Sequence, residues 1–195
     1  KRSQNRRLQR RPPSSSRCPL AETALQRRYR TRLQGIRTAT LRRVLAANVG
    51  PTSSFVETVV PFVLAAQSVT VTEADAYLSA EAGMATGTST RPWGLDPAQL
   101  IGVRARRGDW LEDVYGRNHR ADASSFAERM AREVNTDITL ADRAATYVHT
   151  EGDTRITGYR RVLSAGKNCG LCVVASDRLY HKSDLRPIHA HCGCT

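Results

Sequence analysis

Hydrophobic and polar positions alternate with the period of an α-helix along much of the first 150 residues. From Leu20 to Asn48, apolar side chains recur about every third or fourth position, and arginines fill most of the others. This spacing predicts a basic amphipathic helix, weakened in its middle by Gly35 and ended by Gly50 and Pro51. Its apolar face needs a partner, either in the core of this chain or in another protein.

The next segments predict further helices with breaks between them. A helix from about Ser54 to Gln67 is expected to be interrupted or kinked at Pro61. A separate helix is expected to start at Thr72, whose hydroxyl caps it while Asp75 closes a capping box. That helix is expected to end near residue 82, and the segment GMATGTSTRPWG that follows reads as a loop.

Helical patterning resumes in the second half of the chain. Asp96 followed by Pro97 is a typical helix start, because it supplies an N-cap acceptor and a preset φ. Apolar positions then recur with helical spacing from Trp110 to 115 and from 126 to 134, and a last helix is expected over 140–149. We expect the aromatic side chains of these segments to pack in the core.

After Gly152 the pattern changes to short segments rich in β-branched and aromatic residues. The segments GYRRVLSAG, LCVVAS and RLYH predict a small antiparallel hairpin or sheet. The fold class expected is α+β, with a mostly α-helical N-terminal and middle region and a small β-hairpin Cys/His-rich C-terminal module. We divide the chain into a basic disordered arm (1–19), a helical region (20–150) and the β-rich module (151–195).

Net positive charge is confined to the N-terminal quarter. Residues 1–50 hold 14 Lys/Arg and one acidic residue, a net charge of +13, so the remaining 145 residues carry −1 of the total +12. This asymmetry favours contact with nucleic acid or an acidic protein surface, with a solvated tail as the alternative. The arginines expected to make this contact are Arg2, Arg6, Arg7, Arg10, Arg11, Arg27, Arg28, Arg30, Arg32, Arg42 and Arg43.

Membrane contact is not expected. The basic segment lacks the Trp and Phe side chains that insert into lipid, and no apolar run approaches the length of about 18 residues that a bilayer span needs. We therefore expect a soluble chain.

Cysteines and histidines cluster near the C-terminus in the pattern C-x2-C-x16-H-x-H-C-x-C. These six side chains exceed the four ligands of tetrahedral zinc, and a structural zinc ion would tie down strands too short to fold alone. The assignment favoured by the spacing is Cys169, Cys172, His189 and either Cys192 or Cys194. Disulfides and free buried thiols are the alternatives, and Cys18 is expected to be a lone thiol.

Catalytic motifs are not evident in the sequence. There is no G-x-S-x-G elbow, and His119, His149, Ser164 and Ser176 stand in no arrangement typical of a hydrolase. Redox chemistry is not favoured, because a catalytic C-x2-C pair is expected at a helix N-terminus in a βαβ setting rather than among short strands. Asp177 or Asp184 would be a general base only if the zinc site were open.

The succession GYRRVL, CGLC, ASDRLY and L-x-PIH-x-x-C-x-C resembles the C-terminal signature of phage Mu F-like minor head proteins, particularly those of actinobacterial tailed phages. The resemblance covers about residues 158–195, and FVETVVPFVLAAQSVTVTEADAYL is similar to the helical region of such proteins. It implicates Cys169, Cys172, His189, Cys192 and Cys194 as ligands and leaves His191 at a variable position.

This resemblance implies a low-copy virion protein located in the capsid interior near the portal vertex and assembled in the bacterial cytoplasm. Its implied partners are the portal protein, the major capsid protein and packaged DNA. Relatives are often described as capsid maturation proteases, so a protease that processes capsid or scaffold proteins is the alternative function, and a zinc-dependent nuclease or DNA-binding regulator is a weaker third. Relatives also continue beyond the point that matches Cys194, so we expect the natural protein to be longer.

Overall fold

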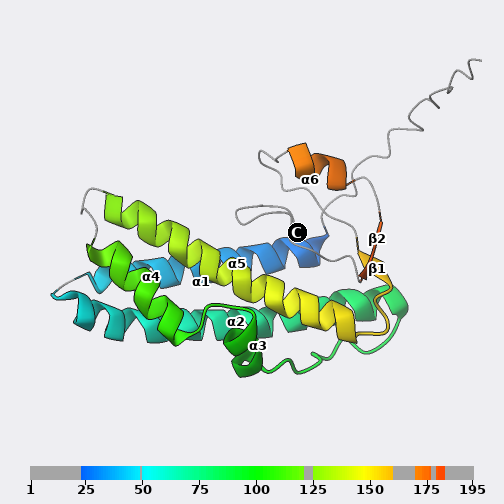
Figure 1. Cartoon of the computed structure of the whole chain (residues 1–195). Coiled ribbons are helices and arrows are strands. Elements are labelled where there is room, and N and C mark those ends of the chain that lie inside the picture. The colour runs from blue at the N-terminus through cyan, green and yellow to red at the C-terminus, as the bar shows by residue number, and fades with distance from the viewer. Residues whose placement is uncertain (1–22, 49, 121–124, 160–169, 177–178, 183–195) are drawn as a thin grey trace, which may run out of the picture.

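The computed structural model of the chain describes residues 23–48, 50–120, 125–159, 170–176 and 179–182. This part is mostly helical and has a small two-stranded antiparallel sheet near the C-terminus (Figure 1). The helices are α1 (Ala24–Ala46), α2 (Thr52–Thr86), α3 (Pro97–Val103), α4 (Gly108–Arg120), α5 (Phe126–Gly152) and α6 (Gly170–Ala175), and the strands are β1 (Gly158–Tyr159) and β2 (Tyr180–His181).

Helix α1 confirms the predicted basic helix within the described residues. A capping box starts it: the Thr23 hydroxyl accepts the backbone N–H of Gln26 at 3.1 Å, and the Gln26 side chain accepts the backbone N–H of Thr23 at 2.9 Å. The helix ends at Ala46, ahead of Gly50, whose φ of 82° is a conformation that favours glycine.

Helix α2 overturns the prediction of two helices. It runs without a break through Pro61, and the Thr72 hydroxyl donates to the Ser68 carbonyl at 3.2 Å instead of capping a new helix. Pro61 lies on the exposed side, and the rest of the helix packs against α1, α3, α4 and α5 over its length. These tertiary contacts outweigh the local cost of proline. The helix also extends past residue 82 into the predicted loop and ends at Gly87, where φ is 67°.

Helices α3 to α5 follow the sequence more closely. The Asp96 side chain accepts the backbone N–H of Ala98 at 2.9 Å, as predicted for the N-cap of α3. The two helical patterns on either side of residue 137 belong to one helix, α5, rather than to separate helices. Tyr115 and Phe126 are buried as expected, but the Trp110 side chain is 57% exposed, with the Arg107 guanidinium 5.4 Å from its ring.

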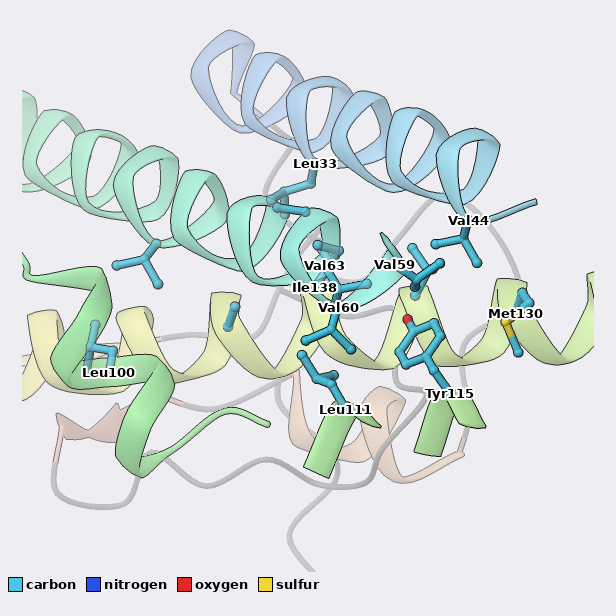
Figure 2. Packing of buried hydrophobic residues seen from close by; sticks show 14 of the residues in the cluster. Leu33, Val44, Val59, Val60, Val63, Leu100, Leu111, Tyr115, Met130 and Ile138 are labelled. Carbon is cyan, nitrogen blue, oxygen red and sulfur yellow. The ribbon is translucent and has the colours of Figure 1, made fainter. Parts of the chain in front are cut away.

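The core lies between α2 and the helices that pack against it, α1, α3, α4 and α5. Figure 1 shows α2 running along one side of the bundle for its whole length. Figure 2 shows the buried side chains that meet there, with those of α1 pointing toward α2 and α5. They include Leu33 and Val44 from α1, Val59, Val60 and Val63 from α2, Leu111 and Tyr115 from α4, and Met130 and Ile138 from α5. The other helices pack against most sides of α2, which keeps one stripe toward solvent at Glu57, Pro61, Val69 and Thr72.

By length and composition, α2 is the one described helix that could cross a membrane. This finding contradicts the expectation that no segment reaches that length, because the expectation counted an interrupted run instead of one continuous helix. The polar side chains of Gln67, Thr70, Asp75 and Ser79 on α2 are buried among its neighbours. A bundle helix packed against its neighbours has the same length and composition, and such buried polar groups suit that role.

The predicted C-terminal sheet is confirmed in part. Gly158 pairs with His181 and Tyr159 with Tyr180, and the two tyrosine rings stack with centroids 5.2 Å apart. The segment LCVVAS, expected as a strand, instead lies mostly in helix α6. A β-branched pair such as Val173 and Val174 favours strands only where neighbouring strands pack against it, so its preference for a strand is weak.

Candidate functional site

The predicted zinc ligands lie almost entirely outside the described residues. This holds for Cys169, His189, Cys192 and Cys194, and for Cys172 only the backbone is described, in α6. In the described ranges, no group of three or more His, Cys, Asp or Glu side chains gathers as a metal site. The zinc site therefore stays a prediction. One premise against redox chemistry was wrong, because Cys172 lies in a helix and not in a strand.

The predicted basic contact is described only where it falls on α1. Arg2, Arg6, Arg7, Arg10 and Arg11 lie outside the described residues. On α1, exposed side chains belong to Arg27, Arg28, Arg32, Arg42 and Arg43, whereas Arg30 is half-buried. The structure thus places most of the α1 candidates on the solvent side of the bundle.

The orientation of α1 is set by polar contacts with α5. The Tyr29 hydroxyl donates to the Asp142 carboxylate, and the Tyr29 ring stacks on Tyr77 of α2 with centroids 4.3 Å apart. Arg37 reaches inward and donates to the Thr139 hydroxyl at 3.3 Å. Burial raises the pKa of Asp142, and its hydrogen bond with Tyr29 partly offsets that rise. These contacts hold one side of α1 inward and leave the opposite side to solvent.

A serine, a histidine and an aspartate meet in the interior between α2 and α5. The Ser79 hydroxyl lies 3.0 Å from Nε2 of His149, and Oδ1 of Asp75 lies 3.4 Å from the same nitrogen. All three side chains are buried. Burial lowers the pKa of His149, and the nearby Asp75 carboxylate partly offsets this effect, so the imidazole is neutral at neutral pH.

This arrangement does not match a hydrolytic triad. In a triad, the serine hydroxyl and the aspartate carboxylate bind opposite nitrogens of the imidazole. One nitrogen accepts the proton of the serine, while the aspartate bound to the other nitrogen orients the ring. Here both approach Nε2, and Nδ1 of His149 has no hydrogen-bond partner in the described structure. Ser79 is also 0% exposed, so a substrate carbonyl cannot reach its hydroxyl in this conformation.

Asp75 and His149 instead anchor the loop that connects α2 to α3, and Ser79 holds the His149 ring through Nε2. The Asp75 carboxylate accepts backbone N–H groups of Trp93 at 3.2 Å, Gly94 at 2.7 Å and Leu95 at 3.1 Å. The Trp93 ring then packs edge-on against the His149 ring, with centroids 5.5 Å apart. Asp75, predicted to cap a helix, therefore holds a distant loop by charge-assisted hydrogen bonds.

Arg155 fastens the same loop from the other side. Its guanidinium donates to the Ser89 carbonyl at 2.7 Å and to the Asp153 carboxylate, with the shortest contact at 2.7 Å. This pairing lowers the pKa of Asp153. Gly152 leaves room for the Trp93 ring, because a Cβ at that position would lie 1.8 Å from the ring and would force it to move.

A second buried polar cluster joins α4, α5 and the segment before α4. The Tyr115 hydroxyl donates to Asp137 at 3.0 Å, and Nε of Arg106 lies 3.4 Å from the other Asp137 oxygen. Arg106 also donates to Glu133 at 2.6 Å. Burial raises the pKa of Asp137 to about 7 despite the opposing effect of Arg106. The sequence patterns did not single out Asp137 or Ser79, because their partners lie on other elements.

These clusters are buried and link elements of the bundle, so we assign them to folding rather than to chemistry. On the described surface, the basic side of α1 is the feature that matches the predicted contact with a negatively charged partner. Comparisons of the chain with protein families, with curated proteins and with solved structures found no match.

Proposed function

We propose that the chain is a minor capsid protein of a tailed phage that acts in head morphogenesis. It binds the portal protein and the inner capsid surface, where its basic N-terminal part also meets packaged DNA. In this proposal Cys169, Cys172, His189, Cys192 and Cys194 supply the ligands of a structural zinc ion that holds the C-terminal module together. The observation that carries the proposal is the C-terminal signature from GYRRVL to L-x-PIH-x-x-C-x-C.

Two features of the described residues support a binding role. The buried polar clusters link helices to one another and to the loop after α2, as expected of a rigid scaffold. The solvent side of α1 carries several arginines and suits a polyanionic or acidic partner. The alternative, a capsid maturation protease, is not favoured by the buried Ser79, whose hydroxyl shares Nε2 of His149 with Asp75.

Quantitative mass spectrometry of purified, DNA-filled particles tests residency in the head. We expect a defined, low number of copies of this chain in each mature particle. Absence from mature heads together with accumulation in precursor particles would overturn the structural role and favour a transient protease or assembly factor. Particles assembled with Ser79→Ala or His149→Ala chains, each checked by circular dichroism to be folded, are expected to show normal processing of capsid proteins. Loss of processing with a folded variant would favour the protease.

The zinc site is tested with a matched pair of cysteine variants. Cys169→Ser is expected to lose bound zinc and to block head assembly, because a thiolate ligand is removed. Cys18→Ser removes a thiol outside the motif and is expected to keep both the bound zinc and normal head assembly. Elemental analysis of the purified proteins measures the metal. Normal assembly and full zinc content in Cys169→Ser would rule out the proposed site.

A further inference from the structure

The solvent side of α1 has an unusual charge pattern. The helix holds seven arginines and no aspartate or glutamate over Ala24–Ala46. A helix that serves only to cover a core usually mixes both signs of charge on its outer side. The one-signed surface therefore indicates a negatively charged partner.

The bundle itself uses some of these arginines. Arg37 reaches toward Thr139, and burial lowers its pKa. Arg32 pairs with Glu73 of α2 at 2.6 Å, and the Arg43 guanidinium lies 5.3 Å from the Phe62 ring. An external partner would bind arginines of α1 that make no contact within the bundle.

Arg28 and Arg42 are such residues. Both side chains are exposed, and neither has a hydrogen bond, ion pair or ring contact with another described residue. They are 14 residues apart in the sequence, which is close to four helical turns, so they lie on the same side of α1. At about 1.5 Å per residue, they stand about 21 Å apart along the helix axis.

The surface between these two arginines consists mainly of small, uncharged residues, and the exposed Arg32, paired with Glu73, borders it. On the same side of the helix it presents Thr31, Gly35 and Ala39, which are exposed. Gly35 is open to solvent, since a Cβ built there would meet nothing within 4 Å. The residues directly between Arg28 and Arg42 are short, and the Arg32 guanidinium beside them is itself positively charged, so a polyanion can approach closely.

We infer that this surface binds the phosphate backbones of duplex DNA, with Arg28 on one strand and Arg42 on the other across the major groove. The groove is about 12 Å wide between its edges, and flexible arginine side chains spaced about 21 Å apart can reach phosphates on both sides of it. Contacts with phosphates carry no sequence information, so the binding is independent of sequence.

DNA fits this surface better than an acidic protein does. A stable protein interface has aromatic or large apolar anchors at its centre, surrounded by a polar rim. Between Arg28 and Arg42, the outer side of α1 offers threonine, glycine and alanine instead. The inference deepens the proposed function and rests on it, because a protein on the inner capsid surface is exposed to packaged duplex DNA.

The test measures binding of the purified full chain to a fluorescently labelled duplex of random sequence, by anisotropy over a range of salt concentrations. The test variant is Arg28→Gln combined with Arg42→Gln. The control variant is Arg107→Gln combined with Arg117→Gln, which removes the same charge from exposed arginines paired with Asp109 and Asp113. Circular dichroism checks that both variants are folded.

Each lost phosphate contact is expected to weaken binding about eightfold at about 0.1 M salt and to reduce the slope of log affinity against log salt by about one. We therefore expect the test variant to bind the duplex more weakly than the control variant does. We also expect its slope of log affinity against log salt to be smaller by about two. Equal affinity and slope in the two variants would overturn the inference. Stronger binding of the unmodified chain to polyglutamate than to the duplex would also overturn it, in favour of an acidic protein. Either result removes the DNA contact of α1 and leaves the copy number in particles, and so the structural role in the head, to be tested separately.

Discussion

Replacement of Asp137 by Asn removes a buried carboxyl whose pKa is raised to about 7 by desolvation. In the unfolded chain this carboxyl ionises near its usual pKa of 3.8. Between these two values the folded protein binds more protons than the unfolded chain, so its stability falls as the pH rises. The stability associated with this group is fully present below about pH 4 and is lost as the pH rises through about 7.

The expected magnitude follows from the two pKa values. A rise from 3.8 to about 7 corresponds, at about 1.4 kcal/mol for each tenfold step, to about 4 kcal/mol of unfolding free energy. The amide introduced by Asp137→Asn resembles the protonated acid, because its oxygen can still accept from the Tyr115 hydroxyl. The variant should therefore gain stability relative to the unmodified chain by up to about 4 kcal/mol between about pH 4 and about pH 8.

Urea unfolding followed by circular dichroism at a series of pH values measures this difference. The comparison between the two proteins matters, because His149 acts in the opposite direction. Its lowered pKa gives stability above its usual pKa that is lost as the pH falls. That contribution cancels in the difference between the Asp137→Asn variant and the unmodified chain.

Asp113→Asn is the matched control, since this carboxylate is exposed and pairs with Arg117 on the surface. Its effect on stability should stay within about 1 kcal/mol at every pH. A stability difference between Asp137→Asn and the unmodified chain that does not change with pH would refute the assignment of a raised pKa to Asp137.

The remaining predictions concern the loop after α2 and the glycines of the helices. Asp75→Asn should destabilise the protein by about 1 to 3 kcal/mol, because a charged acceptor of three backbone N–H groups is lost, and hydrogen exchange should show faster exchange at Trp93, Gly94 and Leu95. Unchanged protection of these amides would contradict the anchoring role of Asp75. Gly152→Ala should displace the Trp93 ring and lower the unfolding temperature, whereas Gly35→Ala, in open space within α1, should raise stability by about 0.5 to 1 kcal/mol. If thermal unfolding ranks the two glycine variants the other way, the packing described around Trp93 is wrong.

Several features of the fold were predictable from local sequence. The basic helix α1, its end before Gly50 and the N-cap at Asp96 follow from spacing and from the conformational preferences of a few adjacent residues. The confinement of net positive charge to the N-terminal quarter is likewise a property of the sequence alone. These features depend on residues that are adjacent in the sequence, so the sequence pattern alone predicts them.

Local sequence did not predict that the separately predicted helical segments would join into the long helices α2 and α5. Pro61 and Thr72 are local signals for a break and a start, yet α2 continues through both. The free energy of packing along α1, α4 and α5 exceeds the local preference of either residue. A similar weakness of local preference explains why Val173 and Val174 lie in helix α6 and not in a strand.

The sequence by itself determined the helical character of the chain, its basic N-terminal quarter and the Cys/His motif on which the zinc prediction depends. Only the tertiary structure decided how the buried polar groups are paired and which arginines of α1 face solvent. Ser79 and His149 are 70 residues apart, and Asp75 and Gly94 are 19 apart, so no local pattern could join them. The pKa of Asp137 and the exposure of Arg28 and Arg42 depend in the same way on which elements cover a residue, and that is settled only when the bundle packs.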